Sequence, residues 1–259
     1  MSLAQNSPSP RPLLVANWKM NGTPELVAEF VACFGHELPE LDVIDLVICP
    51  PAVLISGLVD QLEASPAAVG AQTCHQQATG AFTGEQSAPM LKTAGCDYVI
   101  VGHSERRELF GEDDQLVAAK CRAVLQADMI PIVCVGESQS QRQKGTTEAV
   151  IREQINAIMR GLEAQDLARI VVAYEPVWAI GTGISATAEQ AQAVHQLLRS
   201  SLSEVCDSES IRLLYGGSVK PDNAAELFAM PDIDGALVGG AALDAESFLG
   251  ICRAAVKKC

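Results

Sequence analysis

The stretch IVVAYEPVWAIGTG (170–183) contains an apolar strand pattern, a carboxylate and an unusual loop. Residues 170–173 are apolar and mostly β-branched without alternation, as expected for a parallel strand buried on both faces. Glu175 follows this strand, and residues 176–183 are almost entirely apolar or glycine, although loops are normally polar and solvated. A helical pattern then occupies 188–205. The unit is therefore a strand, an apolar loop and a helix.

The same alternation of strand and helix patterns runs through the rest of the chain. Further apolar runs lie at 13–15, 43–48, 68–71, 98–101, 130–135, 211–214 and 235–238, and further helical patterns at 113–127, 146–162 and 245–256. Eight such strands in about 250 residues predict an α/β fold, a single-domain (β/α)8 TIM barrel with eight parallel strands. A doubly wound open sheet remains the alternative, although no G-x-G-x-x-G follows the first strand.

The composition limits the domain organisation and the class of partner. No linker divides residues 12–259, which we expect to form one catalytic domain, whereas the Ser/Pro-rich residues 1–11 are predicted to be a disordered tail without a signal peptide. A net charge of −14 argues against a nucleic-acid partner, and no apolar run has transmembrane length. The cysteines include no C-x-x-C pair, which favours reduced thiols and a cytoplasmic protein.

In either fold, functional side chains are expected just beyond the carboxyl ends of the strands. The first strand is followed by NWKMN (17–21), which places Asn17 and Lys19 there. Most lysines are ordinary surface residues. Lys19 is a better candidate for function because it lies two residues beyond a buried strand and is flanked by Trp18 and Met20.

His103 follows the fourth strand in GHSERR (102–107), at the expected start of a short helix. A helix N-terminus disfavours a protonated imidazole, so His103 is predicted to be neutral and able to donate a hydrogen bond to a carbonyl oxygen. The other histidines, His36, His75 and His195, are interpreted as structural.

Two glycine pairs follow the last two strands, in YGGSVKPDN (215–223) and VGGAAL (238–243). Their backbone N–H groups, with the Ser218 hydroxyl, are typical of an anion site. No metal-ligand spacing and no Walker motif is present. With Glu175, these parts predict cofactor-free proton transfer beside a carbonyl on a small phosphorylated substrate.

The motifs NWKMN, GHSERR, YEPVWAIGTG, YGGSVKPDN and VGGAAL occur in this order, and together they resemble the triosephosphate isomerase family over roughly residues 12–256. The resemblance implies an aldose-ketose isomerase of glycolysis and gluconeogenesis. Its reaction would interconvert dihydroxyacetone phosphate and D-glyceraldehyde 3-phosphate through an enediolate, without a cofactor or metal.

The resemblance also implies a role for each site residue. Glu175 is the base and His103 the neutral electrophile, and triosephosphate isomerase is itself a standard example of this pair. Lys19 and Asn17 stabilise negative charge on the substrate, and Glu105 orders Lys19. The remaining assignments are Ser104, which holds Glu175 when the lid is open, and the phosphate-binding group of Gly181, Ser218, Gly239 and Gly240.

Residues 176–186 resemble the mobile lid of the family, which is apolar because it excludes water when closed. Pro176 stiffens one hinge, and Gly183, like Gly181, lets the backbone approach the phosphate. Trp178 is the apolar flap, and its indole N–H needs an acceptor, for which Glu137 is the candidate.

GAFTGE (80–85) resembles the loop that inserts into the partner subunit of this family and places Thr83, next to Phe82, beside the partner's catalytic residues. A homodimer is implied. Three residues depart from the common pattern: Thr73, Ile184 and Ala242 stand where asparagine, lysine and serine are frequent. None of the three is a proposed catalytic group.

Two alternatives remain. A Schiff-base aldolase could use Lys19, but it has no use for Glu175 followed by a long apolar lid. An inactive barrel could act as a binding module, but such a protein should have lost Lys19, His103 or Glu175, and all three are present.

Overall fold

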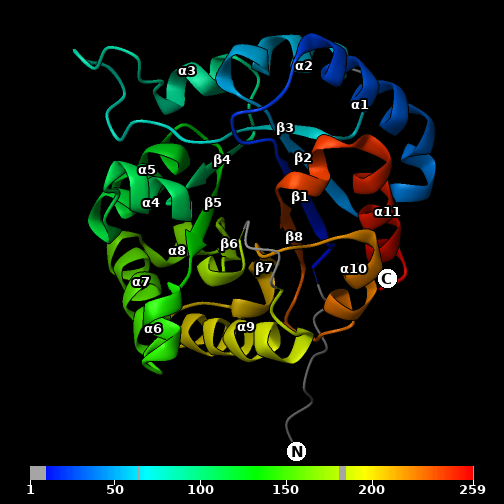
Figure 1. The fold of residues 1–259 in the computed structure, drawn as a ribbon. Coiled ribbons are helices and arrows are strands. Elements are labelled where there is room, and N and C mark those ends of the chain that lie inside the picture. The colour runs from blue at the N-terminus through cyan, green and yellow to red at the C-terminus, as the bar shows by residue number, and fades with distance from the viewer. Residues whose placement is uncertain (1–9, 63–64, 181–184, 259) are drawn as a thin grey trace, which may run out of the picture.

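The computed structural model describes residues 10–62, 65–180 and 185–258, with the side chains of 35–39 excepted. Within these residues, eight parallel strands close into a barrel in sequence order, and helices surround it (Figure 1). The strands are β1 (Leu13–Asn17), β2 (Asp45–Cys49), β3 (Ala68–Ala71), β4 (Tyr98–Val101), β5 (Ile130–Val135), β6 (Val171–Tyr174), β7 (Arg212–Tyr215) and β8 (Gly235–Val238).

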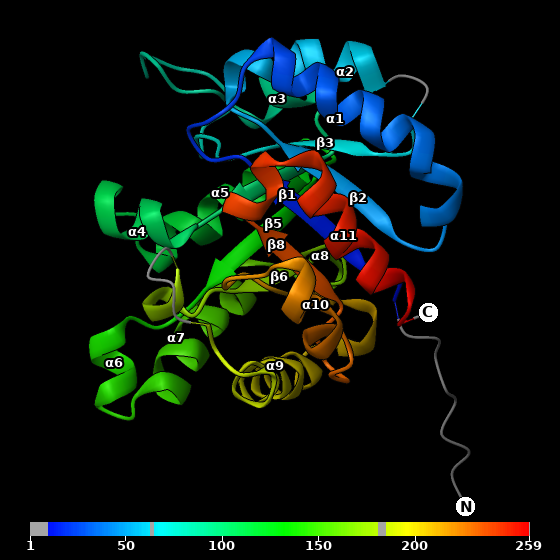
Figure 2. The same ribbon diagram turned by 45° about the vertical axis from the view of Figure 1, so that its right-hand side comes forward.

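The α-helices follow the strands and cover the outside of the barrel, as the rotated view in Figure 2 also shows. They are α1 (Pro24–Glu37), α2 (Ile55–Leu62), α3 (Ala88–Thr93), α4 (Ser104–Phe110), α5 (Asp114–Gln126), α6 (Gln139–Gln143), α7 (Thr147–Gly161), α8 (Ala164–Leu167), α9 (Ala188–Ser203), α10 (Pro221–Phe228) and α11 (Ala245–Val256). Short 3-10 helices are η1 (Leu38–Leu41), η2 (Ala52–Leu54), η3 (Val177–Ala179), η4 (Ser208–Ser210) and η5 (Gly240–Leu243).

The predicted barrel is confirmed, and the open-sheet alternative is wrong because β1 pairs with both β2 and β8. The strand at 170–173 begins and ends one residue later than predicted, at Val171 and Tyr174. The helix predicted at 245–256 has these bounds. The helix predicted at 188–205 begins as predicted and ends at Ser203.

Alternate residues of each strand pack into two apolar layers. Leu13 and Val15 of β1 face the barrel interior, and Leu14 and Ala16 pack beneath the helices. Because both faces of every strand are buried, the strands read as continuous apolar runs in the sequence. The interior is therefore filled, and the space for a ligand lies at the rim.

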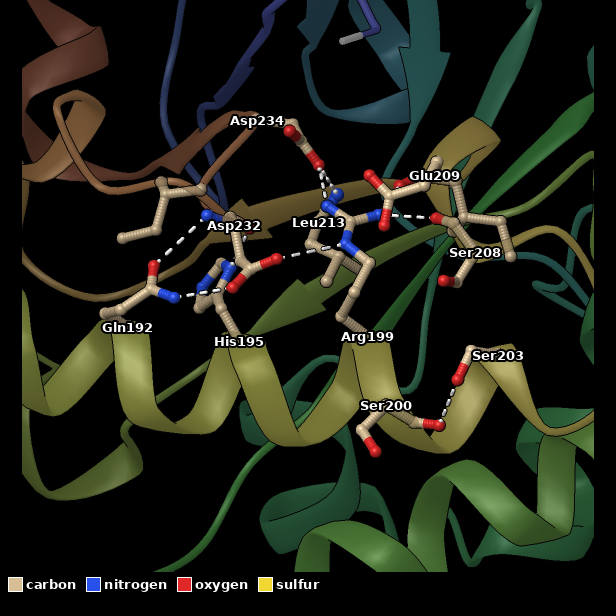
Figure 3. Close-up of polar contacts among 12 residues, drawn as sticks. Gln192, His195, Arg199, Ser200, Ser203, Ser208, Glu209, Leu213, Asp232 and Asp234 are labelled. Atoms are coloured by element: carbon tan, nitrogen blue, oxygen red, sulfur yellow. Dashed lines mark hydrogen bonds and ion pairs between the residues drawn. The ribbon is translucent and has the colours of Figure 1, made fainter. Parts of the chain in front are cut away.

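A buried ionic cluster attaches α9 to the segments flanking β7 (Figure 3). The guanidinium of Arg199 lies 2.6 Å from the carboxylate of Asp234 and 3.3 Å from that of Asp232. It also donates to the carbonyl oxygens of Ser208 and Ile211, at 2.5 and 2.7 Å. A buried charge is tolerated when its donors are paired in this way. The cluster fixes the helix after the predicted lid against the strands that carry the glycine pairs.

Residues 1–9 of the predicted tail lie outside the described residues. Arg11, which the prediction assigned to the tail, instead contacts the barrel. It donates to the carbonyl oxygens of Asp42 and Ile44, the latter at 3.0 Å, and lies 3.4 Å from the Asp45 carboxylate. The ordered domain therefore includes Arg11. Within the described part of the chain, no helix is both long and apolar enough to cross a membrane.

Candidate active site

The carboxyl ends of the strands surround a cavity of about 910 Å³. Because all strands are parallel, residues that directly follow them meet at one rim although they are far apart in sequence. The cavity brings together the predicted residues Asn17, Lys19, His103, Glu175, Ser218, Gly239 and Gly240. Glu105 completes this group through its contact with Lys19.

Glu175 is fixed by the main chain and by α4. Its N–H group extends the β5–β6 ladder by donating to the carbonyl oxygen of Val135 at 2.8 Å. The carboxylate is only 2% exposed and accepts from the backbone N–H of Ser104 at 2.8 Å and from its hydroxyl at 3.3 Å. Burial raises the pKa of Glu175, but the neighbouring His103 and the Ser104 N–H together lower it by more, so the pKa lies below its usual value. Glu175 is therefore ionised at neutral pH.

His103 is the N-cap of α4, as its position after β4 predicted. Its Nδ1 accepts the backbone N–H of Glu105 at 3.2 Å, and its Nε2 lies 3.0 Å from the Glu175 carboxylate. An Nδ1 that accepts a hydrogen bond carries no proton, so the proton of the neutral ring is on Nε2.

One prediction about His103 needs correction. Burial lowers the pKa of His103, but the charge and hydrogen bond of Glu175 raise it more, so the net direction is upward rather than the predicted downward one. The Glu175 carboxylate, rather than the start of α4, sets the direction of the pKa shift, because it lies closer to the imidazole ring.

Lys19 is held by contacts at both its backbone and its side chain. Its Nζ lies 2.5 Å from the Glu105 carboxylate, which is the contact that the family resemblance implied. The backbone φ of Lys19 is +52°, a strained value for a residue with a side chain. Its N–H donates to Asn17 at 3.1 Å, and the Gln72 amide donates to its carbonyl oxygen at 2.8 Å. Sequence analysis assigned no role to Gln72, although its position directly after β3 could have indicated one.

The predicted anion site forms part of the wall of the same cavity as Glu175 and Lys19. Ser218 lies in the loop after β7, and Gly239 and Gly240 lie at the start of η5. A side chain at Gly239 would approach the Lys19 side chain to 3.3 Å. The glycine therefore lets an anion on this loop lie close to the lysine.

The described part of the predicted lid is anchored through Trp178. Its indole N–H donates to the carboxylate of Glu137 at 2.9 Å, which confirms the predicted acceptor. Glu137 is fully buried and also contacts Arg142 at 3.0 Å and the Tyr174 hydroxyl at 3.1 Å. The Arg142 guanidinium lies 4.3 Å from the centre of the Trp178 ring, a cation–π contact. Pro176 directly precedes η3, and Gly181, Gly183 and Ile184 lie outside the described residues.

The segment between β3 and α3 extends beyond the ring of helices in both views (Figures 1 and 2). It carries Phe82, which is 44% exposed and lies over His75 with ring centres 3.9 Å apart, and the exposed Thr83. Thr73 accepts a hydrogen bond from Lys120 at 3.1 Å, and Ala242 is fully buried in η5. Neither Thr73 nor Ala242 lines the cavity.

The fold and the cavity together define an enzyme of the (β/α)8 barrel class. Known proteins narrow this class: the family model described as triosephosphate isomerase matches residues 12–255. The triosephosphate isomerase of Herminiimonas arsenicoxydans is 51% identical over 95% of this chain and 99% of its own length. That of Roseiflexus sp. (strain RS-1) is 49% identical over 93% and 96%.

A crystal structure of triosephosphate isomerase from Bartonella henselae is 38% identical, with a TM-score of 0.85 over 94% of this chain and 98% of that one. The chain belongs to the triosephosphate isomerase family. It is an isomerase of triose phosphates.

Proposed function

We propose that the cavity interconverts dihydroxyacetone phosphate and D-glyceraldehyde 3-phosphate by moving one proton between adjacent carbons. The observation that supports this most strongly is the ionised, buried Glu175 beside His103 and Lys19 in one cavity. A base, a hydrogen-bond donor for a carbonyl and a cation are the groups that enediolate formation needs.

Glu175 removes a proton from the carbon next to the carbonyl, and the electrons of the C–H bond form the C=C bond of the enediolate. The carbonyl oxygen gains negative charge and receives a hydrogen bond from the Nε2–H of His103. Lys19, with Asn17, stabilises the same charge. The Nε2–H of His103 passes its proton to the former carbonyl oxygen, and Nε2 takes the hydroxyl proton of the adjacent carbon, whose oxygen becomes the new carbonyl. Glu175 then returns its proton to the former carbonyl carbon, so no group of the protein is consumed.

The phosphate of the substrate binds to the loops of Ser218 and of Gly239 and Gly240. Backbone N–H groups of the lid, including that of Gly181, are further donors to the phosphate. The net charge of −14 repels anions overall, so these donors and Lys19 must supply the attraction locally. Pro176 stiffens one hinge of the lid and Trp178 is its apolar flap, and the closed lid excludes water during the reaction.

We further propose that the enzyme is a cytoplasmic homodimer. Large apolar side chains are exposed on the rim loops and on the neighbouring α3 and α4, which supports a covered surface. They are Met20, Val53, Phe82, Met90, Leu109 and Phe110. In the dimer, Thr83 of one subunit lies beside the catalytic residues of the other.

A coupled assay with D-glyceraldehyde 3-phosphate tests the proposal. The purified protein should form dihydroxyacetone phosphate, measured through a dehydrogenase that reduces it. Absence of this activity in folded protein, with cleavage or aldol products in its place, would support the aldolase alternative.

A further inference from the structure

Past the end of β4, strand β5 has backbone groups that no strand among the described residues pairs on that side. The β4–β5 pairing ends at Val101 and Val133, because the chain turns into α4. The β6 side continues further, as Glu175 and Val177 donate to the carbonyl oxygens of Val135 and Glu137. Residues alternate in direction along a strand, so the backbone groups of residues 134 and 136 point toward the missing β4 neighbour.

Side chains replace the missing strand at both residues. The carbonyl oxygen of Cys134 accepts from the guanidinium of Arg107 at 3.3 Å. Gly136 is paired twice by Gln154 of α7: its N–H donates to Gln154 Oε1 at 2.7 Å, and its carbonyl oxygen accepts from Gln154 Nε2 at 3.1 Å. A primary amide offers the same donor and acceptor as a peptide group, so Gln154 acts as a one-residue extension of the ladder.

Gly136 lies directly against the main chain of the proposed base. A Cβ atom added at Gly136 would lie 1.9 Å from the carbonyl oxygen of Glu175 and 3.2 Å from its Cβ atom. The N–H of Glu175 also donates a hydrogen bond to the carbonyl oxygen of Val135, the residue before Gly136, at 2.8 Å. Movement of Gly136 must therefore move the backbone from which the catalytic carboxylate extends.

Glu137, which directly follows Gly136, accepts the indole N–H of Trp178. The same short backbone segment thus carries the contact surface for Glu175 and the anchor of the lid. Gln154, on α7, supplies both of the side-chain hydrogen bonds to Gly136. Its side chain is half-buried and lies on the wall of a neighbouring cavity of about 520 Å³.

We propose that Gln154 is a positioning residue for the isomerisation, which fixes Glu175 and the Trp178 anchor by completing the β5 ladder at Gly136. The inference rests on the proposed function. Misplacement of a catalytic group by about 1 Å costs on the order of 100-fold in rate, and a partial shift costs correspondingly less.

Two variants of similar side-chain length test the proposal. Gln154→Met removes both hydrogen bonds, and kcat should fall by about 10-fold while KM changes little. Gln154→Glu, when ionised, can accept from the N–H of Gly136 but cannot donate to its carbonyl oxygen. When protonated it regains a donor and an acceptor. Its kcat relative to wild type should therefore rise as the pH is lowered from about 6.5 to 4.5, toward the usual pKa of a glutamate.

Gln139→Glu is the matched control, since it adds the same charge at the wall of the same cavity without binding Gly136. Its pH profile should parallel that of wild type. A Gln154→Glu profile parallel to wild type overturns the proposal, and so does a folded Gln154→Met enzyme with unchanged kcat. If Gln154→Met does not fold, the pH comparison of the two glutamate variants decides. Wild-type activity tests the proposed function separately.

Discussion

The Nε2 atom of His103 lies 3.0 Å from the carboxylate of Glu175, so the proposed electrophile and the proposed base contact each other directly. Glu175 must leave this contact, and the Ser104 N–H at 2.8 Å, before it can reach a carbon atom of the substrate. The departure of Glu175 from this contact also changes the pKa of His103. The carboxylate raises its pKa, whereas burial and Lys19 lower it. Departure of Glu175 therefore favours the neutral imidazole that the reaction requires.

Glu175→Asp tests the reach of the base. The shorter side chain keeps the charge but withdraws the carboxylate by about one methylene, so we expect kcat to fall on the order of 100-fold. Binding of a substrate analogue should change little, because the phosphate loops and Lys19 are untouched. Steady-state kinetics and a competitive inhibitor measure the two effects. Near-normal turnover would show that Glu175 is not the base.

The noncovalent role of Lys19 predicts that borohydride traps no substrate on the enzyme. Lys19 is ion-paired with Glu105 at 2.5 Å, a geometry suited to electrostatic stabilisation of the enediolate. Peptide mass spectrometry after borohydride treatment during turnover is the measurement, with an authentic Schiff-base aldolase as positive control. A mass increase on the Lys19 peptide would favour the aldolase instead.

The barrel and most of its rim could be predicted from the sequence because both depend on simple patterns. Strands buried on two faces appear as apolar runs, and parallel strands bring their carboxyl ends to one side. Asn17, His103 and Glu175 were placed correctly at this rim by their positions at or just beyond strand ends.

The position of Gln72 directly after β3 places it at the rim. The supporting contacts themselves could not be predicted, since they depend on which backbone groups the fold leaves without a strand partner. Gln72 reaches Lys19 across 53 residues, and Gln154 reaches Gly136 across 18. The pKa direction of His103 likewise depends on its distance from Glu175, which directly follows a strand that is not adjacent to β4. No local sequence pattern encodes either relationship.

Phe82→Asp tests the proposed dimer. A negative charge on the protruding 80–85 loop should disfavour its insertion into an apolar partner surface, because an unpaired buried charge is costly. Sedimentation velocity should show a monomer, and activity should fall since Thr83 no longer completes the partner's site. Val205→Asp, at an exposed apolar residue after α9, is the control and should remain dimeric. A fully active Phe82→Asp monomer would refute the shared site.

His195 predicts a pH-dependent loss of stability. Its ring is fully buried, its Nδ1 lies 3.0 Å from the carbonyl oxygen of Asp232, and burial lowers its pKa to about 4. In the unfolded chain the pKa returns to about 6.5. Between these values only the unfolded chain binds the proton, so the free energy of unfolding falls by up to about 1.4 kcal/mol per pH unit as pH decreases.

His195→Gln should remove this component. The melting temperature of wild type should fall more than that of the variant between about pH 7.5 and 5. His103, whose pKa is raised, has the opposite sign, but it is present in both proteins and cancels in the comparison. Glu112 and Glu175 have lowered pKa values and lose their contributions only below about pH 4.5. Equal pH dependence in the two proteins would contradict the assignment to His195.

The proposed lid predicts a change in product rather than only in rate. The enediolate can expel phosphate when its C–O bond to the phosphate aligns with the π system. A closed lid holds the phosphate in the plane and keeps water out.

Deletion of residues 178–182 leaves Glu175 and its contacts in place, so the first proton is still removed. The intermediate should then break its C–O bond, and inorganic phosphate and methylglyoxal should become major products. Trp178→Phe, which keeps the chain length and removes the hydrogen bond to Glu137, should be slower but still give the isomer. Phosphate release measured beside aldehyde formation separates these outcomes, and clean isomer from the shortened enzyme would show that this segment does not protect the enediolate.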